Sequence, residues 1–197
     1  MNSMKRKHGI LDRQFGHPSG LFGSLVRIAM AVEHKALHKT VVDRLPLTPA
    51  DRVLEIGFGP GTATRWASEK AGFVAGIDPS REMVAQAKRR NRSAIRSGRV
   101  EVLRASAEAI PFPDDSFSAV FEVNSFHHWA DRELGLMEVF RVLRPEGRLL
   151  MVLRQGHVEL KSEVERVTKM LARTGFKHIQ LEEHQSGHRG VSVTARK

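Results

Sequence analysis

The sequence predicts an α/β fold in which a largely parallel sheet is covered by helices on both faces. Short apolar segments of strand length alternate with longer segments whose apolar residues recur at helical spacing. Strands that alternate with helices pair in parallel, because each helix returns the chain to the same end of the sheet. The last two strand-like segments, 176–182 and 190–195, have no helix between them. They therefore predict an antiparallel hairpin at one end of the sheet.

Five strands and four helices are expected before that hairpin. The strands are expected at residues 52–56, 73–77, 100–103, 117–123 and 148–153. The helices are expected from 62 to about 71, at 80–97, at 131–143 and at 158–174. Gly98 is the expected left-handed residue after the second of these helices. Pro145 and Gly147 end the third helix, because proline cannot continue it and glycine favours a turn.

The first 45 residues form a separate segment. Apolar residues recur at helical spacing from Leu21 to Leu45, and Pro46 and Pro49 then end the pattern. We expect a helical extension at 1–45 and a folded domain at 46–197. The extension could close over a binding site as a substrate lid. Packing against the edge of the sheet and contact with a membrane surface are the alternatives.

Composition limits the function classes. The chain has 197 residues, of which 32 are Lys or Arg and 22 are Asp or Glu, giving a formal net charge of +10. It has no cysteine, which excludes a disulfide scaffold and a cysteine nucleophile, and which fits a cytoplasmic setting. No apolar run is long enough to span a bilayer. The positive charge leaves nucleic acid, an anionic membrane or an anionic substrate as partner classes.

A glycine-rich turn follows the first strand directly, at Gly57-Phe58-Gly59-Pro60-Gly61, and a helix follows the turn. Glycines allow a ligand to lie against bare backbone, and the start of a helix offers free N–H groups to an anion. The spacing differs from the dinucleotide pattern G-x-G-x-x-G. Asp78 closes the second strand, where a carboxylate can accept both hydroxyls of a ribose. The pattern favours a ligand that carries a ribose and a carboxylate.

These segments resemble the motifs of class I S-adenosylmethionine-dependent methyltransferases. Val53–Gly61 is similar to the first motif of the family, and Gly76–Met83 is similar to the second. Further similar segments follow in family order at residues 109–117, 126–129 and 141–149. The resemblance implies a Rossmann-like sheet of seven strands, S-adenosylmethionine as the cofactor and methyl transfer as the activity.

The resemblance also implies which residues bind the cofactor. The glycine turn, including Phe58, would hold the methionine part, with Glu55 orienting the turn. Asp78 would bind the ribose. The remaining expected contacts of the adenine and the methionine part are Pro79, Met83, Ser106, Ala107, Glu108, Val123 and Asn124. The family often has aspartate where this chain has Ser106. Either Ser106 or Glu108 would then accept a hydrogen bond from the adenine amino group.

His127 and His128 are the candidate catalytic residues, because a histidine at this strand end could deprotonate an acceptor near neutral pH. The alternative is that one histidine packs or caps the next helix. No third ligand stands at a suitable spacing, so we predict no metal. Phe126 and Trp129 would form a wall of the acceptor pocket.

The acceptor class depends on two observations. Methyltransferases of nucleic-acid bases resemble one another in an Asn/Asp-Pro-Pro-aromatic motif, whereas this chain has Asn124-Ser125-Phe126. This difference favours a small-molecule metabolite or a lipid head group over RNA. The basic residues of segment 81–104 are partly consecutive and have no aromatic residues among them, which is typical of a solvated face. An RNA methyltransferase and a non-catalytic cofactor-binding regulator remain the alternatives.

Overall fold

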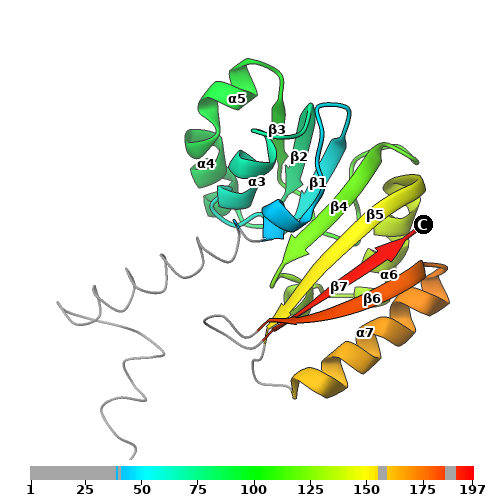
Figure 1. Ribbon diagram of the computed structural model, residues 1–197. Coiled ribbons are helices and arrows are strands. Elements are labelled where there is room, and N and C mark those ends of the chain that lie inside the picture. Colours follow the sequence, from blue (N-terminus) through cyan, green and yellow to red (C-terminus); the bar gives the residue numbers. More distant parts are fainter. Residues whose placement is uncertain (1–38, 40, 155–158, 185–189) are drawn as a thin grey trace, which may run out of the picture. The chain divides into compact units, whose positions relative to one another are not determined.

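The structure is a computed structural model that describes residues 39, 41–154, 159–184 and 190–197 (Figure 1). Most of the expected extension and lid at 1–45 lies outside the described residues. Its last residues, 39 and 41–44, are helical. Among the described residues, no helix is long and apolar enough to cross a membrane.

Seven strands form one sheet in the order β3-β2-β1-β4-β5-β7-β6. They are β1 (Arg52–Ile56), β2 (Phe73–Ile77), β3 (Val100–Leu103), β4 (Phe117–Val123), β5 (Leu143–Arg154), β6 (Lys177–His184) and β7 (Gly190–Arg196). The pairs from β3 to β5 are parallel, and β7 runs antiparallel between β5 and β6. The expected fold class and the C-terminal hairpin are confirmed. The strand order reverses between β1 and β4, which is where open α/β sheets bind ligands.

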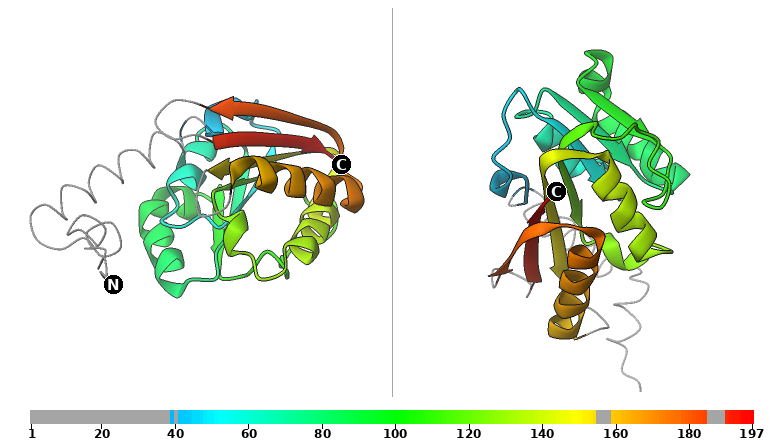
Figure 2. Two further views of the ribbon diagram at one scale, coloured as in Figure 1. Left: turned by 90° about the horizontal axis from the view of Figure 1, so that it is seen from below. Right: turned by 90° about the vertical axis from the view of Figure 1, so that its right-hand side faces the viewer.

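Helices cover both faces of the sheet. They are α3 (Thr62–Ala67), α4 (Arg81–Arg90), α5 (Arg92–Arg96), α6 (Arg132–Val142) and α7 (Leu160–Thr174), with a 3-10 turn η1 (Phe126–His128) after β4. Alternation along β1 places Leu54 and Ile56 in one buried cluster with Leu136 of α6 and Leu171 of α7. Glu55 points to the opposite face, where it contacts α3. Figure 2 shows α7 lying along β6 and β7.

Several element boundaries differ from the expectation by a few residues, among them the end of α3, which is at Ala67 instead of about 71. Two further differences have a structural cause. The helix expected at 80–97 is interrupted at Asn91, whose buried amide donates to the carbonyl oxygens of Gly61 and Ala87. These bonds hold Asn91 outside helical geometry, and Gly98 is left-handed as expected. β5 begins at Leu143 rather than at 148, because Leu143 pairs with Phe117 across an irregularity in the register. Pro145 and Gly147 therefore lie within β5.

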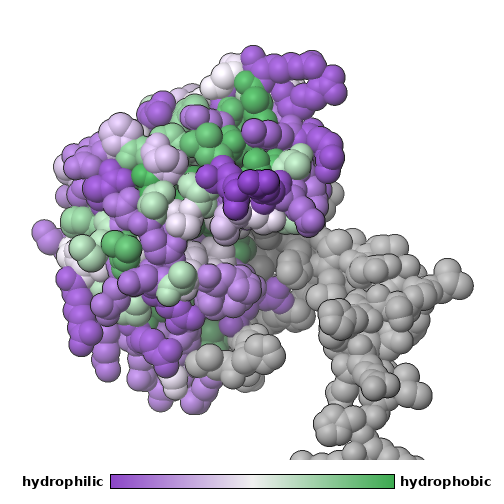
Figure 3. Space-filling view, turned by 180° about the vertical axis from the view of Figure 1, so that it is seen from behind, coloured by the Kyte–Doolittle hydropathy of each residue, from purple (hydrophilic) through white to green (hydrophobic). Residues whose placement is uncertain are grey.

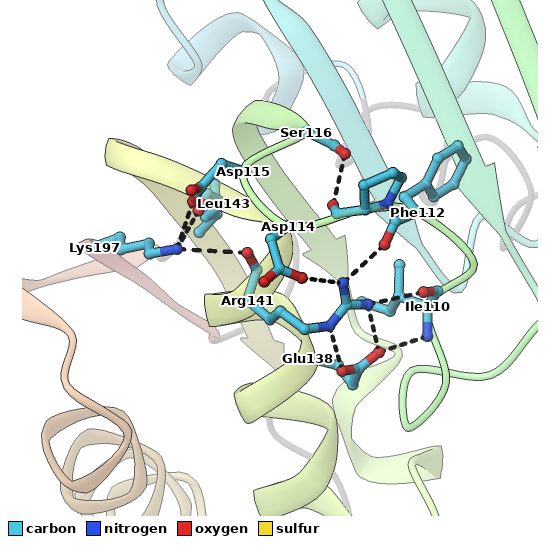
Figure 4. Close-up of polar contacts among 10 residues, drawn as sticks. Ile110, Phe112, Asp114, Asp115, Ser116, Glu138, Arg141, Leu143 and Lys197 are labelled. Atoms are coloured by element: carbon cyan, nitrogen blue, oxygen red, sulfur yellow. Dashed lines mark hydrogen bonds and ion pairs between the residues drawn. The ribbon is translucent and has the colours of Figure 1, made fainter.

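Arg141 of α6 connects the segment at 109–117 to this helix by hydrogen bonds (Figure 4). Its guanidinium donates to the carbonyl oxygens of Ile110 and Phe112 and to the carboxylates of Asp114 and Glu138, at 2.7 to 3.0 Å. Two of the motifs recognised in the sequence are therefore direct contact partners. The resemblance at residues 109–117 and 141–149 therefore includes residues that hold these two segments together, and it is not limited to the glycine turn.

The apolar core is covered over most of the domain. In Figure 3, hydrophilic residues dominate the rear face, and the hydrophobic colour gathers mainly in its upper part. Three large apolar side chains are exposed among the described residues, namely Leu134, Met137 and Leu181. The first two lie on α6 and the third lies on β6.

Candidate cofactor and acceptor site

The glycine turn leaves the carboxyl end of β1 in a conformation that side chains disfavour. Gly57, Gly59 and Gly61 have φ angles of 69°, 53° and 74°, in the left-handed region. The Gly57 N–H donates to the carbonyl oxygen of Ile77 at 2.8 Å, and the Gly61 N–H donates to that of Phe58 at 2.9 Å. Phe58 itself is fully buried. The turn is thus held between β1 and β2 by its own backbone.

The three glycines serve different purposes. A Cβ atom on Gly57 would lie 2.4 Å from the Cβ of Ser125, and one on Gly61 would lie 2.7 Å from the Cβ of Ala87. These two glycines are required by the close approach of other protein atoms. A Cβ on Gly59 would meet nothing within 4 Å. Gly59 is therefore the glycine whose bare backbone is open to a ligand.

Asp78 joins the glycine turn to the end of β2. Its Oδ2 accepts from the N–H of Gly59 at 2.9 Å, and its Oδ1 accepts from the N–H of Ser80 at 2.9 Å. Asp78 is 7% exposed, so little of it reaches solvent. Each carboxylate oxygen has a further lone pair, which can accept a hydroxyl of a ligand. The open backbone at Gly59 beside an acceptor pair fits a ribose-bearing ligand.

Pro79 and Met83 follow Asp78 at the start of α4. Ser80 caps this helix, accepting from the N–H of Met83 at 3.3 Å. The carbonyl oxygen of Pro79 accepts from Arg104 at 3.0 Å. Pro79 is exposed and Met83 is half-buried. Pro79 therefore lies directly after Asp78, and Met83 lies in the first turn of α4.

Glu55 lies under the turn, on the sheet face that α3 covers. It is 1% exposed, and its Oε2 accepts from the hydroxyl of Thr64 on α3 at 2.5 Å. The other oxygen is buried and has no hydrogen-bond partner among the residues that the structure describes. Burial raises the pKa of Glu55 to about 8, although the Thr64 hydrogen bond opposes this. This placement lets Glu55 orient the start of α3.

Glu122 is a second fully buried glutamate, near the end of β4, and it was not among the residues expected in the site. Its Oε2 lies 2.7 and 3.1 Å from the N–H groups of Ser125 and Phe126, and its Oε1 lies 3.1 Å from the N–H of Val152. Burial raises its pKa to about 7 against the effect of these donors. One sequence signal could have found it, a charged residue inside an otherwise apolar strand.

Glu122 thereby connects the ends of three strands. Besides β4 and β5, it reaches β1 through Ser125, whose Oγ lies 3.1 Å from Glu122 Oε2 and 2.9 Å from the carbonyl oxygen of Ile56. The single hydroxyl proton can be given to one of the two acceptors at a time. The turn after β4 is therefore fixed against the glycine turn.

The expected contacts Val123 and Asn124 complete the end of β4. Val123 is buried, and Asn124 is half-buried with a left-handed φ of 55°. The N–H of Asn124 donates to the carbonyl oxygen of Val152 at 3.0 Å. Asparagine is one of the non-glycine residues that adopt this conformation most readily, so the sequence suits the turn after β4.

The histidines and aromatic residues follow in η1. His127 and His128 are both exposed, and their ring centroids are 3.8 Å apart. Phe126 is buried and meets Trp129 edge to face, with ring centroids 5.0 Å apart. The Nε1 of Trp129 is buried without a hydrogen-bond partner in the described part of the chain. Among the residues that the structure describes, no group of three metal-ligating side chains lies together.

The loop after β3 holds Ser106, Ala107 and Glu108. Ala107 is buried, and the Oε1 of Glu108 accepts from the N–H of Asp131 at 3.1 Å. Burial raises the pKa of Glu108, but hydrogen bonds from backbone N–H groups and from Ser106 outweigh this and lower it. Glu108 therefore ties this loop to the start of α6. Ser106 is half-buried beside it.

Comparisons with known proteins agree with this arrangement. A methyltransferase domain model matches residues 54–151. The chain is 35% identical to a putative methyltransferase, YrhH, of Bacillus subtilis over 130 residues, which are 65% of this chain and 68% of that protein. It is 38% identical to the 27-O-demethylrifamycin SV methyltransferase of Amycolatopsis mediterranei over 64% of this chain and 48% of that protein.

A solved structure supports the fold. The chain is similar to a SAM-dependent methyltransferase from Aquifex aeolicus with a TM-score of 0.67 and 24% identity, covering 81% of this chain and 88% of that one. The glycine turn, Asp78 and the strand order with β7 antiparallel agree with the family match. The chain belongs to the class I S-adenosylmethionine-dependent methyltransferases, enzymes whose cofactor is S-adenosylmethionine.

Proposed function

We propose that this methyltransferase acts on a small-molecule metabolite or a lipid head group. One observation carries the proposal: Trp129 and two exposed histidines follow the end of β4, with Phe126 buried against Trp129, and the Pro-Pro motif of base methyltransferases is absent from this segment. The rifamycin-derivative methyltransferase named above supports a small-molecule acceptor. The chain spans about half the length of that relative.

The cofactor would lie across the ends of β1, β2 and β4. S-adenosylmethionine supplies an electrophilic methyl group when it is bound. The Gly59 backbone would pass beside its methionine part, and Asp78 would accept its ribose hydroxyls. Pro79 and Met83 would contact the adenine, with Ser106, Ala107 and Glu108 at its edge. Val123 and Asn124 would complete the wall toward the acceptor.

The protein contributes alignment and exclusion of water. Methyl transfer is an in-line displacement, and correct positioning alone can lower its barrier by roughly 7–11 kcal/mol. Glu122 and Ser125 act as positioning residues, because they fix the turn that carries Phe126 to the end of β1. The buried N–H of Trp129, without a partner in the described part of the chain, is a donor for an acceptor oxygen.

His127 and His128 are the candidate general bases. Because both rings are exposed beside one another, either could take a proton from an acceptor hydroxyl or amine. We expect that replacing the catalytic histidine by alanine lowers kcat by about 10²-fold and removes the fall in rate below neutral pH. The other histidine serves as the matched control. Unchanged pH–rate profiles in both variants would rule out a general base here.

The acceptor class is tested by transfer of a labelled methyl group. The full-length enzyme is incubated with labelled S-adenosylmethionine and, separately, RNA, phospholipid vesicles and a small-molecule extract. We expect label in the extract or the vesicles, and its loss in Asp78→Ala. Label in RNA alone would establish the RNA methyltransferase alternative. Binding of S-adenosylhomocysteine without transfer to any pool would instead support a non-catalytic regulator.

A further inference from the structure

A second recess lies where α3, α4 and α5 meet. It is a pocket of about 510 Å³ that neither Gly59 nor Asp78 lines. Six of its lining residues are arginines, which we call the arginine pocket: Arg65, Arg89, Arg90, Arg92, Arg96 and Arg99. Glu69 is the one acidic residue among the described residues that line it. The pocket gathers arginines from segments up to 34 positions apart, so it is more than a row of consecutive charges.

Three of the arginines have partners in the protein. Arg90 donates to the carbonyl oxygen of Pro60 at 2.7 Å and to the hydroxyl of Thr62 at 2.6 Å. Arg99 donates to the carbonyl oxygen of Ser68 at 3.0 Å. Arg65 forms an exposed ion pair with Glu69, at 3.7 Å. The hydrogen bonds of Arg90 and Arg99 therefore hold two guanidinium groups at the pocket before any ligand arrives.

The other three arginines have uncommitted donors. Arg89, Arg92 and Arg96 are exposed, and the structure gives them no hydrogen bond or ion pair with another described residue. A guanidinium matches the oxygens of a phosphate with two parallel hydrogen bonds. The guanidinium groups around the recess repel one another, and a bound anion reduces that repulsion. The chemistry of the pocket is therefore that of a phosphate receptor.

Asn91 supplies an independent sign of a ligand. It lines the same pocket, is 2% exposed, and uses its Nδ2 on the carbonyl oxygens of Gly61 and Ala87. Its Oδ1 is buried without a hydrogen-bond partner among the described residues. An unpaired buried acceptor is costly, so a donor is expected there. A fully ionised phosphate group offers only acceptors, whereas a sugar hydroxyl is a donor that would satisfy this oxygen.

The form of the pocket distinguishes between anionic ligands. No aromatic residue lines it, so it offers no surface on which single-stranded bases stack. None of the exposed large apolar residues, Leu134, Met137 and Leu181, lines it, so it has no side chains to insert into a bilayer. Its volume is that of a small-ligand site.

We propose that the arginine pocket binds a polyphosphate ester with a hydroxyl-bearing sugar, as in a nucleoside di- or triphosphate, separately from the cofactor. Arg89, Arg92 and Arg96 bind the phosphates, and Asn91 accepts from a sugar hydroxyl. The ligand is not consumed, so the site requires no chemical step. The inference does not depend on the identity of the methyl acceptor.

Titration calorimetry of the full chain at low ionic strength tests this, with uridine triphosphate as the probe because it lacks the adenine of the cofactor. The pocket variant is Arg89→Gln/Arg92→Gln/Arg96→Gln. The matched control is Lys161→Gln/Arg166→Gln/Arg173→Gln on α7, which removes the same charge elsewhere. We expect one site, weakened at least ~10-fold in the pocket variant and less than about twofold in the control.

Three outcomes would overturn the proposal. The first is absence of binding, or equal weakening in the pocket variant and its control. The second is inorganic triphosphate binding as tightly as uridine triphosphate, since the sugar would then contribute nothing. The third is tighter binding of duplex RNA or anionic phosphatidylglycerol vesicles, lost in the pocket variant. Affinity for S-adenosylhomocysteine should stay within about twofold in both variants, which shows that each one folds.

Discussion

The glycine turn and the arginine pocket are both open to ligands, yet they are built in opposite ways. The turn presents backbone and a nearly buried carboxylate, held by short bonds between strand ends. The pocket presents six long arginine side chains, of which only Arg90 and Arg99 are held by hydrogen bonds to described residues. In this protein the strand ends hold their ligand-binding groups in a fixed geometry, whereas the charged helix surface attracts an anionic ligand through flexible side chains. The two regions should therefore respond differently to added methyl groups, to pH and to salt.

The largest effect is expected within the glycine turn itself. Gly61→Ala places a methyl 2.7 Å from the Cβ of Ala87 in a left-handed conformation, which should lower the free energy of unfolding by about 3 kcal/mol. Gly59→Ala meets no protein atom within 4 Å, so its stability cost is only the backbone strain, about 1 kcal/mol. Urea unfolding measures both values.

For binding of S-adenosylhomocysteine the order should be reversed: Gly59→Ala should weaken the affinity more than Gly61→Ala does. The methyl of Gly59→Ala occupies the side from which the cofactor approaches, so S-adenosylhomocysteine should bind at least ~10-fold more weakly. Equal stability of the two variants, or unchanged affinity in Gly59→Ala, would break the distinction between structural and ligand-facing glycines.

The buried residues Glu55 and Glu122 make the stability of the glycine-turn region depend on pH. The pKa of Glu55 rises from 4.5 to about 8 in the folded state, so its contribution to stability is full below pH 4.5 and is lost as pH rises through 8. Glu55→Gln keeps an acceptor for Thr64 and removes the buried charge. It should raise the free energy of unfolding by about 2–4 kcal/mol at pH ~9 and change it little near pH ~5. Thermal melts across pH measure this, with the exposed Glu101→Gln on β3 as the control.

Glu122→Gln should instead destabilise the protein, most clearly near pH ~5. The carboxyl group of Glu122 accepts from the N–H groups of Ser125, Phe126 and Val152, and an amide nitrogen would face at least one of these donors. We expect a loss of about 2 kcal/mol in the free energy of unfolding at pH ~5. The pKa of Glu122 is also raised, to about 7, so its penalty for ionisation develops between pH 4.5 and 7 and offsets this loss at higher pH. Unchanged or raised stability of this variant at pH ~5 would contradict the positioning role.

Salt gives the smallest effect and separates the two ligand sites. Raising the salt concentration from ~50 to ~500 mM shortens the screening length to a few ångströms, which should weaken uridine triphosphate binding by about 10-fold or more. Binding of S-adenosylhomocysteine, which rests on backbone and hydroxyl contacts, should change less than about threefold. Parallel calorimetric titrations of both ligands at the two salt concentrations compare these responses.

The sequence predicted the features that depend on residues close to one another in the chain. The first four strands agree with the expected bounds, because each is a short, mainly apolar run bounded by glycine, polar or charged residues. Asp78 also lies against the glycine turn as its position after β2 implied. The features that it did not predict depend on contacts between segments far apart in the chain. Asn91 interrupts the helix because it bonds to Gly61, 30 residues earlier, and Arg65 joins the arginine pocket from another helix.

The most direct test of the account is calorimetric titration of S-adenosylhomocysteine into the wild-type chain, Asp78→Ala and the surface control Glu101→Gln, with a thermal melt of each variant. Hydrogen bonds to a charged carboxylate are worth about 1.5–3 kcal/mol each. The account predicts one site in the wild type, at least ~100-fold weaker binding in Asp78→Ala and a change below about twofold in Glu101→Gln. Absence of binding to the wild type, or equal affinity in a folded Asp78→Ala, would contradict it.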